Sequence, residues 1–368
     1  MGFLKGFMIA LALFGLGAIA LMSPRLLQAA PVVANGVEAE GEADAQAPKA
    51  TPTILRLGIF VPDRVVHVRA AMIPWLLRVN EKILPMGYEI RLFSGGALGH
   101  DGEMQLRLLM AGVTDITWFP FGYVAGRFRA ISLLEIPVLS DDPMALTRAF
   151  WRLYEGDFFP GLDDVAVLGL SVSPANYLHM AADIDGLEAV SNRKIRVTNA
   201  AQARIVEAMG ATAVGGITAT QIAESLSRKM LDGVLFSWHG TKATGIELTT
   251  RSHMTQALGF TPSAVVMNKS RFLDLPPQVR DAIMAESGEA FSMAITGAMM
   301  AEADKAIGRV KESEDHQFYQ PTPAESAHLK AAFEAMAQQW QGTDQGRGDL
   351  VRELRRLLDL IALEKAPS

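Results

Sequence analysis

The sequence predicts an α/β protein with two lobes, each a mainly parallel sheet flanked by helices. Patterns typical of strands and of helices alternate along the chain, which favours parallel strands joined by right-handed crossovers. The alternation runs once over residues 54–172 and again over 194–236, and a further strand pattern follows. A chain of 368 residues is long enough for two such domains.

The first lobe contains the elements predicted up to residue 172. Strands are predicted at 54–60, 88–93, 113–118 and 168–172, and helices at 66–83, 102–110 and 143–154. Tyr88, Ile90 and Leu92 alternate with charged residues, as in a half-buried strand. Asp101 stands where it can cap the second helix.

The second lobe has its own series of short elements. Strands are predicted at 194–197, 212–214 and 234–236, and helices at 200–209 and 222–230. Gly210 fits a left-handed C-cap, and Thr218 with Gln221 fits a capping box. In the first of these strands, the alternation places Arg196 on the face opposite its apolar neighbours.

Residues beyond 261 are expected to return to the first lobe. A strand at 265–267 and one long helix at 277–312 give lobe I as 53–173 plus 262–301, and lobe II as 174–261 plus 302–342. Lobes joined by several crossings form a hinge that can close over a ligand. Leucines at helical spacing make 343–368 an amphipathic helical tail, which could pack on the body, dimerise or contact a partner.

The first 52 residues belong to neither lobe. Lys5, an apolar run at 7–22 and the small residues that follow are typical of a signal peptide at 1–30, cleaved after Ala30 or Ala34. An uncleaved anchor is the alternative, although the run is short for a spanning helix. Residues 31–52 are rich in Ala, Glu, Pro and Gly, which predicts a flexible linker.

Composition excludes several classes of function. The net charge is −6 and no Lys/Arg tract has interleaved aromatic residues, so nucleic acid is not an expected partner. The chain has no cysteine, which excludes disulfides and thiolate chemistry. Its seven histidines lack metal-ligand spacing, and HExxH, GxSxG, EF-hand and Walker sequences are absent. We therefore expect no metal, no cofactor and no enzymatic activity.

The best candidate for a pocket lies where two strands of the second lobe end. Open α/β sheets bind ligands at the carboxyl ends of their strands, where Arg196 and the residues Phe236, Trp238 and His239 are expected. Arginine can donate two parallel hydrogen bonds to one carboxylate, so Arg196 is either an anchor for an anionic ligand or part of an ion pair within the protein. Of the histidines only His239 is expected in this pocket, as a hydrogen-bonding wall residue.

Two features of the first lobe are also candidates. Trp118 and Tyr123 belong to a dense aromatic cluster at a strand end, which either packs in the core and between lobes or contacts ligand. The glycine-rich residues 95–99 join a strand to a helix, where a plain tight turn or a phosphate cradle would fit.

Several short motifs occur in the order found in one known family. They are LFSGGALG at 92–99, GYVAGRF at 122–128, LEIP at 134–137, KIRV at 194–197, AAQA at 200–203, VEAMGAT at 206–212, DG at 232–233, VMNK at 266–269 and LP at 275–276. Over about residues 52–342 the chain resembles the periplasmic solute-binding receptors of TRAP transporters. The resemblance implies a two-lobe periplasmic-binding-protein-like fold in the periplasm, acting as a monomer. Such a receptor closes around an organic carboxylate and delivers it to TRAP membrane permease subunits.

The resemblance also implies roles for individual residues. Arg196 matches the arginine that pairs with the ligand carboxylate, Asn199 a supporting polar residue, and Asn176 lies near a second polar contact. The chain departs from the family at residues 236–239, where Phe-Ser-Trp-His replaces a polar turn, and Ile217 makes the adjoining wall apolar.

These apolar walls favour an aromatic or hydrophobic monocarboxylate, because burial of apolar area contributes about 25 cal/mol per Å². Small dicarboxylates and keto acids remain alternatives. The alternative function is an extracytoplasmic enzyme that acts on an organic acid with a similar two-lobe scaffold.

Overall fold

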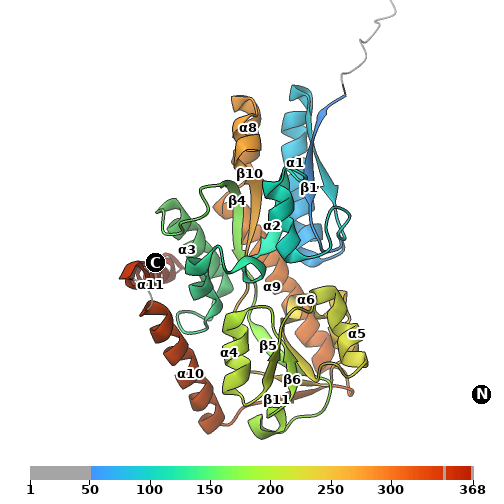
Figure 1. Ribbon diagram of the computed structural model, residues 1–368, viewed down its shortest axis with the longest axis vertical. Coiled ribbons are helices and arrows are strands. Elements are labelled where there is room, and N and C mark those ends of the chain that lie inside the picture. The colour runs from blue at the N-terminus through green and yellow to red at the C-terminus, as the bar shows by residue number, and fades with distance from the viewer. Residues whose placement is uncertain (1–50, 343–344, 366–368) are drawn as a thin grey trace, which may run out of the picture. The chain divides into compact units, whose positions relative to one another are not determined.

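The computed structural model describes residues 51–342 and 345–365, which lie within one compact unit extending from Ala50 to Ser368. Among these residues the strands form two sheets, one of five and one of six strands (Figure 1). The predicted α/β fold with two sheet-based lobes is therefore confirmed, and we keep the names lobe I and lobe II for the parts built on the first and second sheet. The predicted signal peptide and all but the end of the predicted linker lie outside the described residues.

Lobe I is built on a sheet in the order β2-β1-β3-β10-β4. Its strands are β1 (Thr53–Gly58), β2 (Tyr88–Phe93), β3 (Ile116–Pro120), β4 (Val165–Val172) and β10 (Pro262–Asn268). Its helices are α1 (Ile73–Ile83), α2 (Gly102–Met110), α3 (Pro143–Glu155), α7 (Lys269–Leu273) and α8 (Pro277–Ala285), with the short turns η1 (Val68–Met72), η2 (Leu84–Met86), η3 (Phe121–Val124) and η4 (Arg129–Glu135). The first three strands are parallel, whereas β10 runs antiparallel to β3 and β4. Asp101 caps α2 as predicted, accepting from the Met104 N–H at 2.7 Å.

Lobe II is built on a sheet in the order β11-β9-β5-β8-β6-β7. Its strands are β5 (Asn176–Met180), β6 (Lys194–Arg196), β7 (Thr212–Val214), β8 (Gly233–Ser237), β9 (Ser252–Met254) and β11 (Gln317–Tyr319). Its helices are α4 (Ala200–Ala208), α5 (Ile222–Ser227), α6 (Trp238–Thr244) and α10 (Pro323–Gln341), with the short turns η5 (Leu187–Val190), η6 (Ala219–Gln221) and η7 (Ile246–Leu248). Strand β5 is antiparallel to β8 and β9, and the other pairs are parallel. The capping box of Thr218 and Gln221 is present, and Gly210 has the predicted positive φ, 74°.

Two short crossings and one shared helix join the lobes between β4 and β11, and the chain returns to lobe I once more from α10 to the C-terminal helix. Residues 173–175 lead from β4 into β5, and 255–261 lead from β9 back into β10. Helix α9 (Glu289–Lys311) packs Phe291, Ile295 and Met299 into the core of lobe I, and its later residues pack against Trp238 in lobe II. The segments that connect the lobes therefore lie next to the strand ends where a ligand site is expected.

The prediction of one long helix at 277–312 is wrong, because the chain breaks between α8 and α9. Gly288 has φ 91°, a conformation that favours glycine, and its N–H donates to the Leu168 carbonyl at 2.7 Å. A Cβ at this position would lie 3.4 Å from the Trp151 ring. The break lets α9 start against β4 rather than continue the direction of α8.

The glycine-rich segment after β2 forms a tight turn. Gly95 and Gly96 have φ 66° and 79°, and their N–H groups donate to the carbonyls of Val61 and Ile59 at 2.8 and 3.1 Å. Because these donors are used within the protein, the turn does not offer them to a phosphate.

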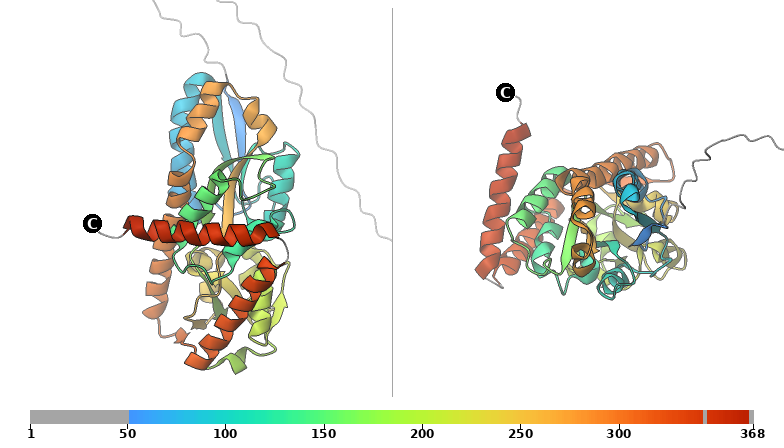
Figure 2. Two further views of the ribbon diagram at one scale, coloured as in Figure 1. Left: turned by 90° about the vertical axis from the view of Figure 1, so that its left-hand side faces the viewer. Right: turned by 90° about the horizontal axis from the view of Figure 1, so that it is seen from above.

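The C-terminal helix α11 (Gln345–Lys365) packs on lobe I. Figure 2 shows it lying across α3, against which it buries Leu354 and Ile361 completely. Glu364 accepts from Arg152 at 3.1 Å on the same side. None of the helices that the structure describes combines the length and the apolarity needed to cross a membrane.

The packing of α11 predicts a measurable loss of stability when its contact face is truncated. Leu354→Ala should lower the free energy of unfolding by about 2–5 kcal/mol, because it leaves a cavity in the core. Leu363→Ala on the same helix is the control, since Leu363 is 70% exposed and should change stability by less than about 0.5 kcal/mol. Equal effects in chemical denaturation would show that α11 does not pack as described.

Candidate functional site

A cavity of about 100 Å³ lies between the strand ends of the two lobes. Its walls are Phe60, Val61, Val65, His67, Trp118, Pro120, Tyr123, Ser173, Asn176, Thr198, Ala219, Phe236, Ser237, His239, Gly240, Ala243, Thr244, Thr261, Ser263 and Met299. This lining, drawn from the described residues, contains no Asp, Glu, Lys or Arg side chain. The cavity is mostly apolar with a few uncharged polar groups, which is the usual character of a small-molecule site.

Lobe I contributes a row of aromatic side chains to the cavity. Phe60 stacks on Trp118 with ring centroids 5.6 Å apart and meets Tyr123 edge-on at 5.8 Å. His67 also packs against Trp118, with ring centroids 4.4 Å apart. Trp118 and Tyr123 thus line the cavity and also pack against neighbouring rings.

Arg196 lies at the junction of the two lobes, directly behind the cavity wall. Its Nε donates to the Ile217 carbonyl at 2.9 Å and its Nη1 to Thr198 Oγ1 at 2.7 Å, both in lobe II. Its Nη2 donates to Tyr123 Oη of lobe I at 3.3 Å. Arg196 itself does not line the cavity, but Thr198 and Tyr123 do. A guanidinium has five N–H groups, so these bonds leave two.

The charge of Arg196 has no acidic partner among the described residues. The side chain is only 1% exposed, and it bonds to a carbonyl and two hydroxyls rather than to a carboxylate. A buried charge is costly unless it is paired, so this arrangement leaves a positive site that an anion would stabilise. The alternative of an ion pair within the protein is therefore not what the structure shows.

The two asparagines implied by the resemblance occupy different places. Asn176 lines the cavity, and its amide donates to Thr261 Oγ1 at 3.2 Å. Asn199 does not line it. Its side chain caps α4 by accepting from the Gln202 N–H at 2.8 Å, and its amide donates to Glu135 Oε1 of lobe I at 2.9 Å. In this structure Asn199 therefore bonds across the lobe junction.

The residues at the end of β8 are divided between two environments. Phe236 and His239 line the cavity, and His239 Nδ1 bonds to Ser237 Oγ at 2.9 Å. Trp238 points elsewhere: it is 2% exposed and packs against His179 and His253, with centroids 4.5 and 4.8 Å away. Ile217 contributes its carbonyl to Arg196 and is not part of the lining.

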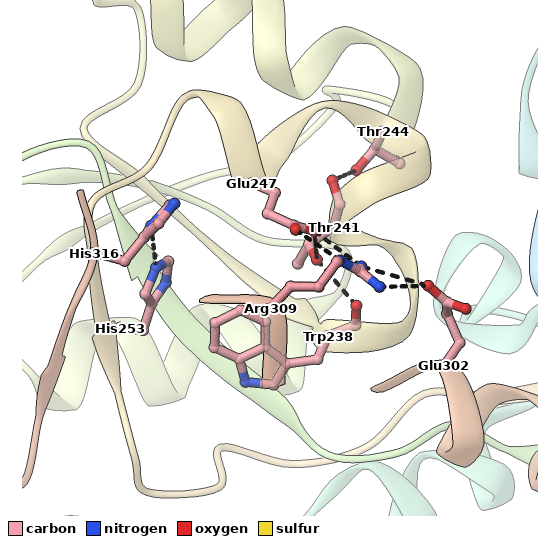
Figure 3. Close-up of polar contacts among 8 residues, drawn as sticks. All are labelled: Trp238, Thr241, Thr244, Glu247, His253, Glu302, Arg309 and His316. Atoms are coloured by element: carbon pink, nitrogen blue, oxygen red, sulfur yellow. Dashed lines mark hydrogen bonds and ion pairs between the residues drawn. The ribbon is translucent and has the colours of Figure 1, made fainter. Parts of the chain in front are cut away.

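Three histidines that are scattered in the sequence form a chain behind Phe236. His179 Nε2 bonds to the Phe236 carbonyl at 3.1 Å, and its Nδ1 bonds to His253 Nδ1 at 2.9 Å. His253 Nε2 bonds in turn to His316 Nδ1 at 3.0 Å, the contact that Figure 3 shows. Since a carbonyl only accepts, His179 Nε2 is the donor to Phe236, and the other nitrogen of this ring, Nδ1, is an acceptor. His253 therefore donates to it through Nδ1, and His253 Nε2 accepts from His316 Nδ1. Burial lowers the pKa of His179 to about 4, and burial with the neighbouring rings lowers that of His253 to about 2, so both are neutral near pH 7. No group of three or more His, Asp or Glu side chains suited to a metal ion occurs in the described part of the chain.

An ion-pair network fixes α6 to the shared helix α9. Arg309 of α9 pairs with Glu247 at 3.2 Å and with Glu302 at 3.4 Å, and Glu247 accepts from Thr241 of α6 at 3.2 Å (Figure 3). Because His239 lies in the first turn of α6, this network holds one wall of the cavity on the helix that both lobes share.

A second hollow of about 720 Å³ adjoins the cavity and shares Val65, His239 and Ala243 with it. Arg64, Arg69 and Lys242 line it and are exposed, and they form no ion pair with another described residue. Exposed cations around an approach to a cavity raise the local concentration of anions.

Sequence reasoning missed part of the lining. The expectation that His239 would be the only histidine in the pocket is wrong, because His67 lines it too, with its ring centroid 6.3 Å from that of His239. Phe60 and His67 follow the carboxyl end of β1, so the strand-end rule would have found them had it been applied to lobe I. Ser263 and Met299 come from the return strand and the shared helix, and no local signal marks them.

A mostly apolar cavity between two sheet-based lobes, with a buried cation behind its wall that has no acidic partner among the described residues, is typical of a ligand-binding protein. A family model described as bacterial extracellular solute-binding protein, family 7, matches residues 62–343, and the chain belongs to this family. This confirms the resemblance inferred from the motifs. Because the family is one of solute-binding proteins, it supports a receptor over the alternative of an enzyme.

Solved structures share the fold. A marine metagenome TRAP solute-binding protein specific for aromatic acids, in complex with 3-hydroxybenzoate, has a TM-score of 0.76 and 20% identity, covering 84% of this chain and 99% of that one. A TRAP solute-binding protein from Rhodoferax ferrireducens with copurified benzoate has a TM-score of 0.74 and 22% identity, covering 85% and 100%. One from Bordetella bronchiseptica with bound (R)- and (S)-mandelate has a TM-score of 0.75 and 20% identity, covering 84% and 100%.

A curated relative matches part of the sequence. The outer membrane transporter protein TsaT of Comamonas testosteroni is 27% identical over 197 residues. The matched region spans 52% of this chain and 58% of TsaT.

Glu135 predicts a pH dependence of stability. Burial raises the pKa of this carboxyl to about 8 from its ordinary 4.5. The protonated form is favoured in the folded state, so its contribution to stability is full below about pH 4.5 and is lost as the pH rises to about 8. Glu135→Gln keeps an acceptor for the Asn199 amide and cannot ionise. The melting temperature of this variant minus that of wild type should therefore increase as the pH rises from 5 to 8. Thermal unfolding across that range checks this, with the exposed Glu314→Gln as control, and a constant difference between Glu135→Gln and wild type would contradict it.

Proposed function

We propose that the protein is the ligand-binding receptor of a TRAP-type transporter and that it closes around one aromatic or hydrophobic monocarboxylate. The carboxylate pairs with Arg196, and the ring or aliphatic body lies against Phe60, Trp118 and Phe236. The observation that carries this proposal is the guanidinium of Arg196, which is 1% exposed and bonded only to neutral oxygens. A ligand carboxylate would supply the missing negative charge through the remaining N–H groups.

The uncharged lining supports a single acid group on the ligand. The lining has no Lys or Arg, and burial lowers the pKa of His239 to about 4, so this histidine supplies no positive charge near pH 7. The structures with benzoate, 3-hydroxybenzoate and mandelate share the fold, and acids of this kind match the size and apolar character of the cavity. The exposed cations Arg64, Arg69 and Lys242 would attract such an anion to the adjoining hollow.

Binding to Arg196 would couple closure to the ligand. Its bonds reach Thr198 and Ile217 in lobe II and Tyr123 in lobe I, so an acid held there contacts groups from both lobes. We propose that the closed receptor delivers the acid to TRAP membrane permease subunits, that it acts as a monomer, and that residues 1–30 direct it to the periplasm.

Loss of the guanidinium should remove most of the affinity. Arg196→Ala is expected to weaken binding of benzoate, or of the best acid found, by on the order of 3–5 kcal/mol, because the buried carboxylate loses its partner. Titration calorimetry measures this, and Arg204→Ala is the control because Arg204 is exposed on α4 and bonds to Gln339. Unchanged affinity in Arg196→Ala would show that the acid is held elsewhere.

A thermal-shift screen identifies the class of ligand. Aromatic and hydrophobic monocarboxylates at 100 times their dissociation constant should stabilise the protein by about 2.7 kcal/mol. Sugar acids should stabilise it less, because hydroxyls left unpaired against the apolar wall cost about 1–3 kcal/mol each. A larger shift with sugar acids than with any aromatic acid would refute the proposed class.

A further inference from the structure

Three polar atoms of the cavity wall are buried and have no hydrogen-bond partner: Trp118 Nε1 and both ring nitrogens of His67. The two side chains are 6% and 2% exposed, and both residues line the cavity. Three other buried tryptophans contrast with this. Trp75, Trp151 and Trp340 donate to oxygens of Ser287, Glu155 and Ser132 at 3.2, 2.8 and 2.9 Å. A buried donor or acceptor without a partner is unfavourable, so such atoms in a cavity wall indicate a missing polar partner.

These atoms form a second polar pole of the cavity, separate from Arg196. Contacts lead from Arg196 to Tyr123 at 3.3 Å, from Tyr123 to Phe60 at 5.8 Å, from Phe60 to Trp118 at 5.6 Å, and from Trp118 to His67 at 4.4 Å. An aromatic face therefore separates the guanidinium from the His67 and Trp118 nitrogens. A ligand ring against this face would carry its acid at one end and meet the second pole with another part of the ring.

The unpaired atoms specify the chemistry of the missing partner. Trp118 offers one donor, and a neutral imidazole offers one donor and one acceptor. Burial, together with His239, lowers the pKa of His67 to about 3, so the ring is neutral near pH 7. A hydroxyl can accept from the Trp118 N–H and pair as donor or acceptor with the nearer ring nitrogen of His67, and thus gives each residue a partner. A second carboxylate only accepts, and no cation lines the cavity to offset its charge.

We propose that His67 and Trp118 form a subsite for a neutral hydroxyl group, so that the ligand is a hydroxylated aromatic monocarboxylate. This rests on the proposed function, because it presupposes an acid held at Arg196. The subsite discriminates between ring substituents of the same shape: a hydroxyl is bound, a methyl leaves the three nitrogens unpaired, and a carboxylate introduces an uncompensated charge.

The test is titration calorimetry of the full-length protein with matched acids. These are benzoate, 3- and 4-hydroxybenzoate, the corresponding methylbenzoates, and isophthalate. The better hydroxybenzoate should bind roughly 10- to 100-fold more tightly than the methylbenzoate of the same pattern. Isophthalate should bind more weakly than either. Equal affinity of the hydroxyl and methyl acids, or tightest binding of isophthalate, overturns the subsite.

Two variants connect the preference to the residues. His67→Phe and Trp118→Phe keep a ring in the wall and remove the nitrogens. Each should reduce the preference for hydroxyl over methyl to within about threefold, and this ratio within one variant is the quantity measured. His100→Phe is the control at an exposed position outside the cavity and should keep the full preference. Thermal unfolding checks that each variant is folded. If a variant is not folded, the affinities of wild type for the hydroxyl and methyl acids test the subsite.

The outcomes separate this proposal from the one on which it rests. If the acids bind wild type, lose affinity in Arg196→Ala and show no preference that depends on His67 or Trp118, the receptor function stands and the hydroxyl subsite is wrong. If none of the acids binds wild type, the hydroxyl subsite is wrong, and the thermal-shift screen of other hydrophobic monocarboxylates then tests the receptor function. A preference that disappears in both ring variants supports the subsite.

Discussion

The arrangement of this molecule depends on one buried guanidinium with no acid beside it. Arg196 is fully enclosed at the junction of the lobes, and its partners are a carbonyl and two hydroxyls. A buried charge of this kind is unfavourable without a counter-charge, so the closed arrangement gains stability from whatever anion reaches it. A ligand shifts a conformational equilibrium only through its different affinity for the two states, and a carboxylate at this position would contact both lobes only when they are closed.

The hydrogen-bond and ion-pair networks near Arg196 fix residues of the cavity wall and do not themselves line the cavity. The histidine chain ends on the Phe236 carbonyl, and the Arg309 network fixes the helix that begins after β8. Helix α9 carries packing residues for both lobes and lines the cavity through Met299, so one element serves the cavity wall and both cores. Two arginines of the protein differ in their partners: Arg309 is paired with carboxylates of the protein, whereas Arg196 has no carboxylate partner among the described residues.

The second junction between the lobes is a pairing of Asn199 with Glu135. Gly122 permits it, because a Cβ there would lie 2.9 Å from the Asn199 amide nitrogen. The protonated Glu135 carboxyl adds no negative charge that could compete with a ligand for the guanidinium. In the same way the neutral His67 and His239 leave the cavity lining without charge. The unpaired positive charge at the site is therefore that of Arg196.

The sequence by itself determined the order and type of the elements predicted up to residue 236, the caps at Asp101, Thr218 and Gly210, and the membership of a solute-binding family. These follow from local periodicity, turn chemistry and the order of motifs, which depend on residues close in the chain. Only the tertiary structure decided which side chains meet. It brought His67 next to His239, turned Trp238 away from the cavity, ended α8 before Gly288, and buried Arg196 although it alternates with apolar neighbours. Alternation gives the phase of a strand but not whether both of its faces are covered, and contacts between residues more than a hundred positions apart are set by how the lobes pack.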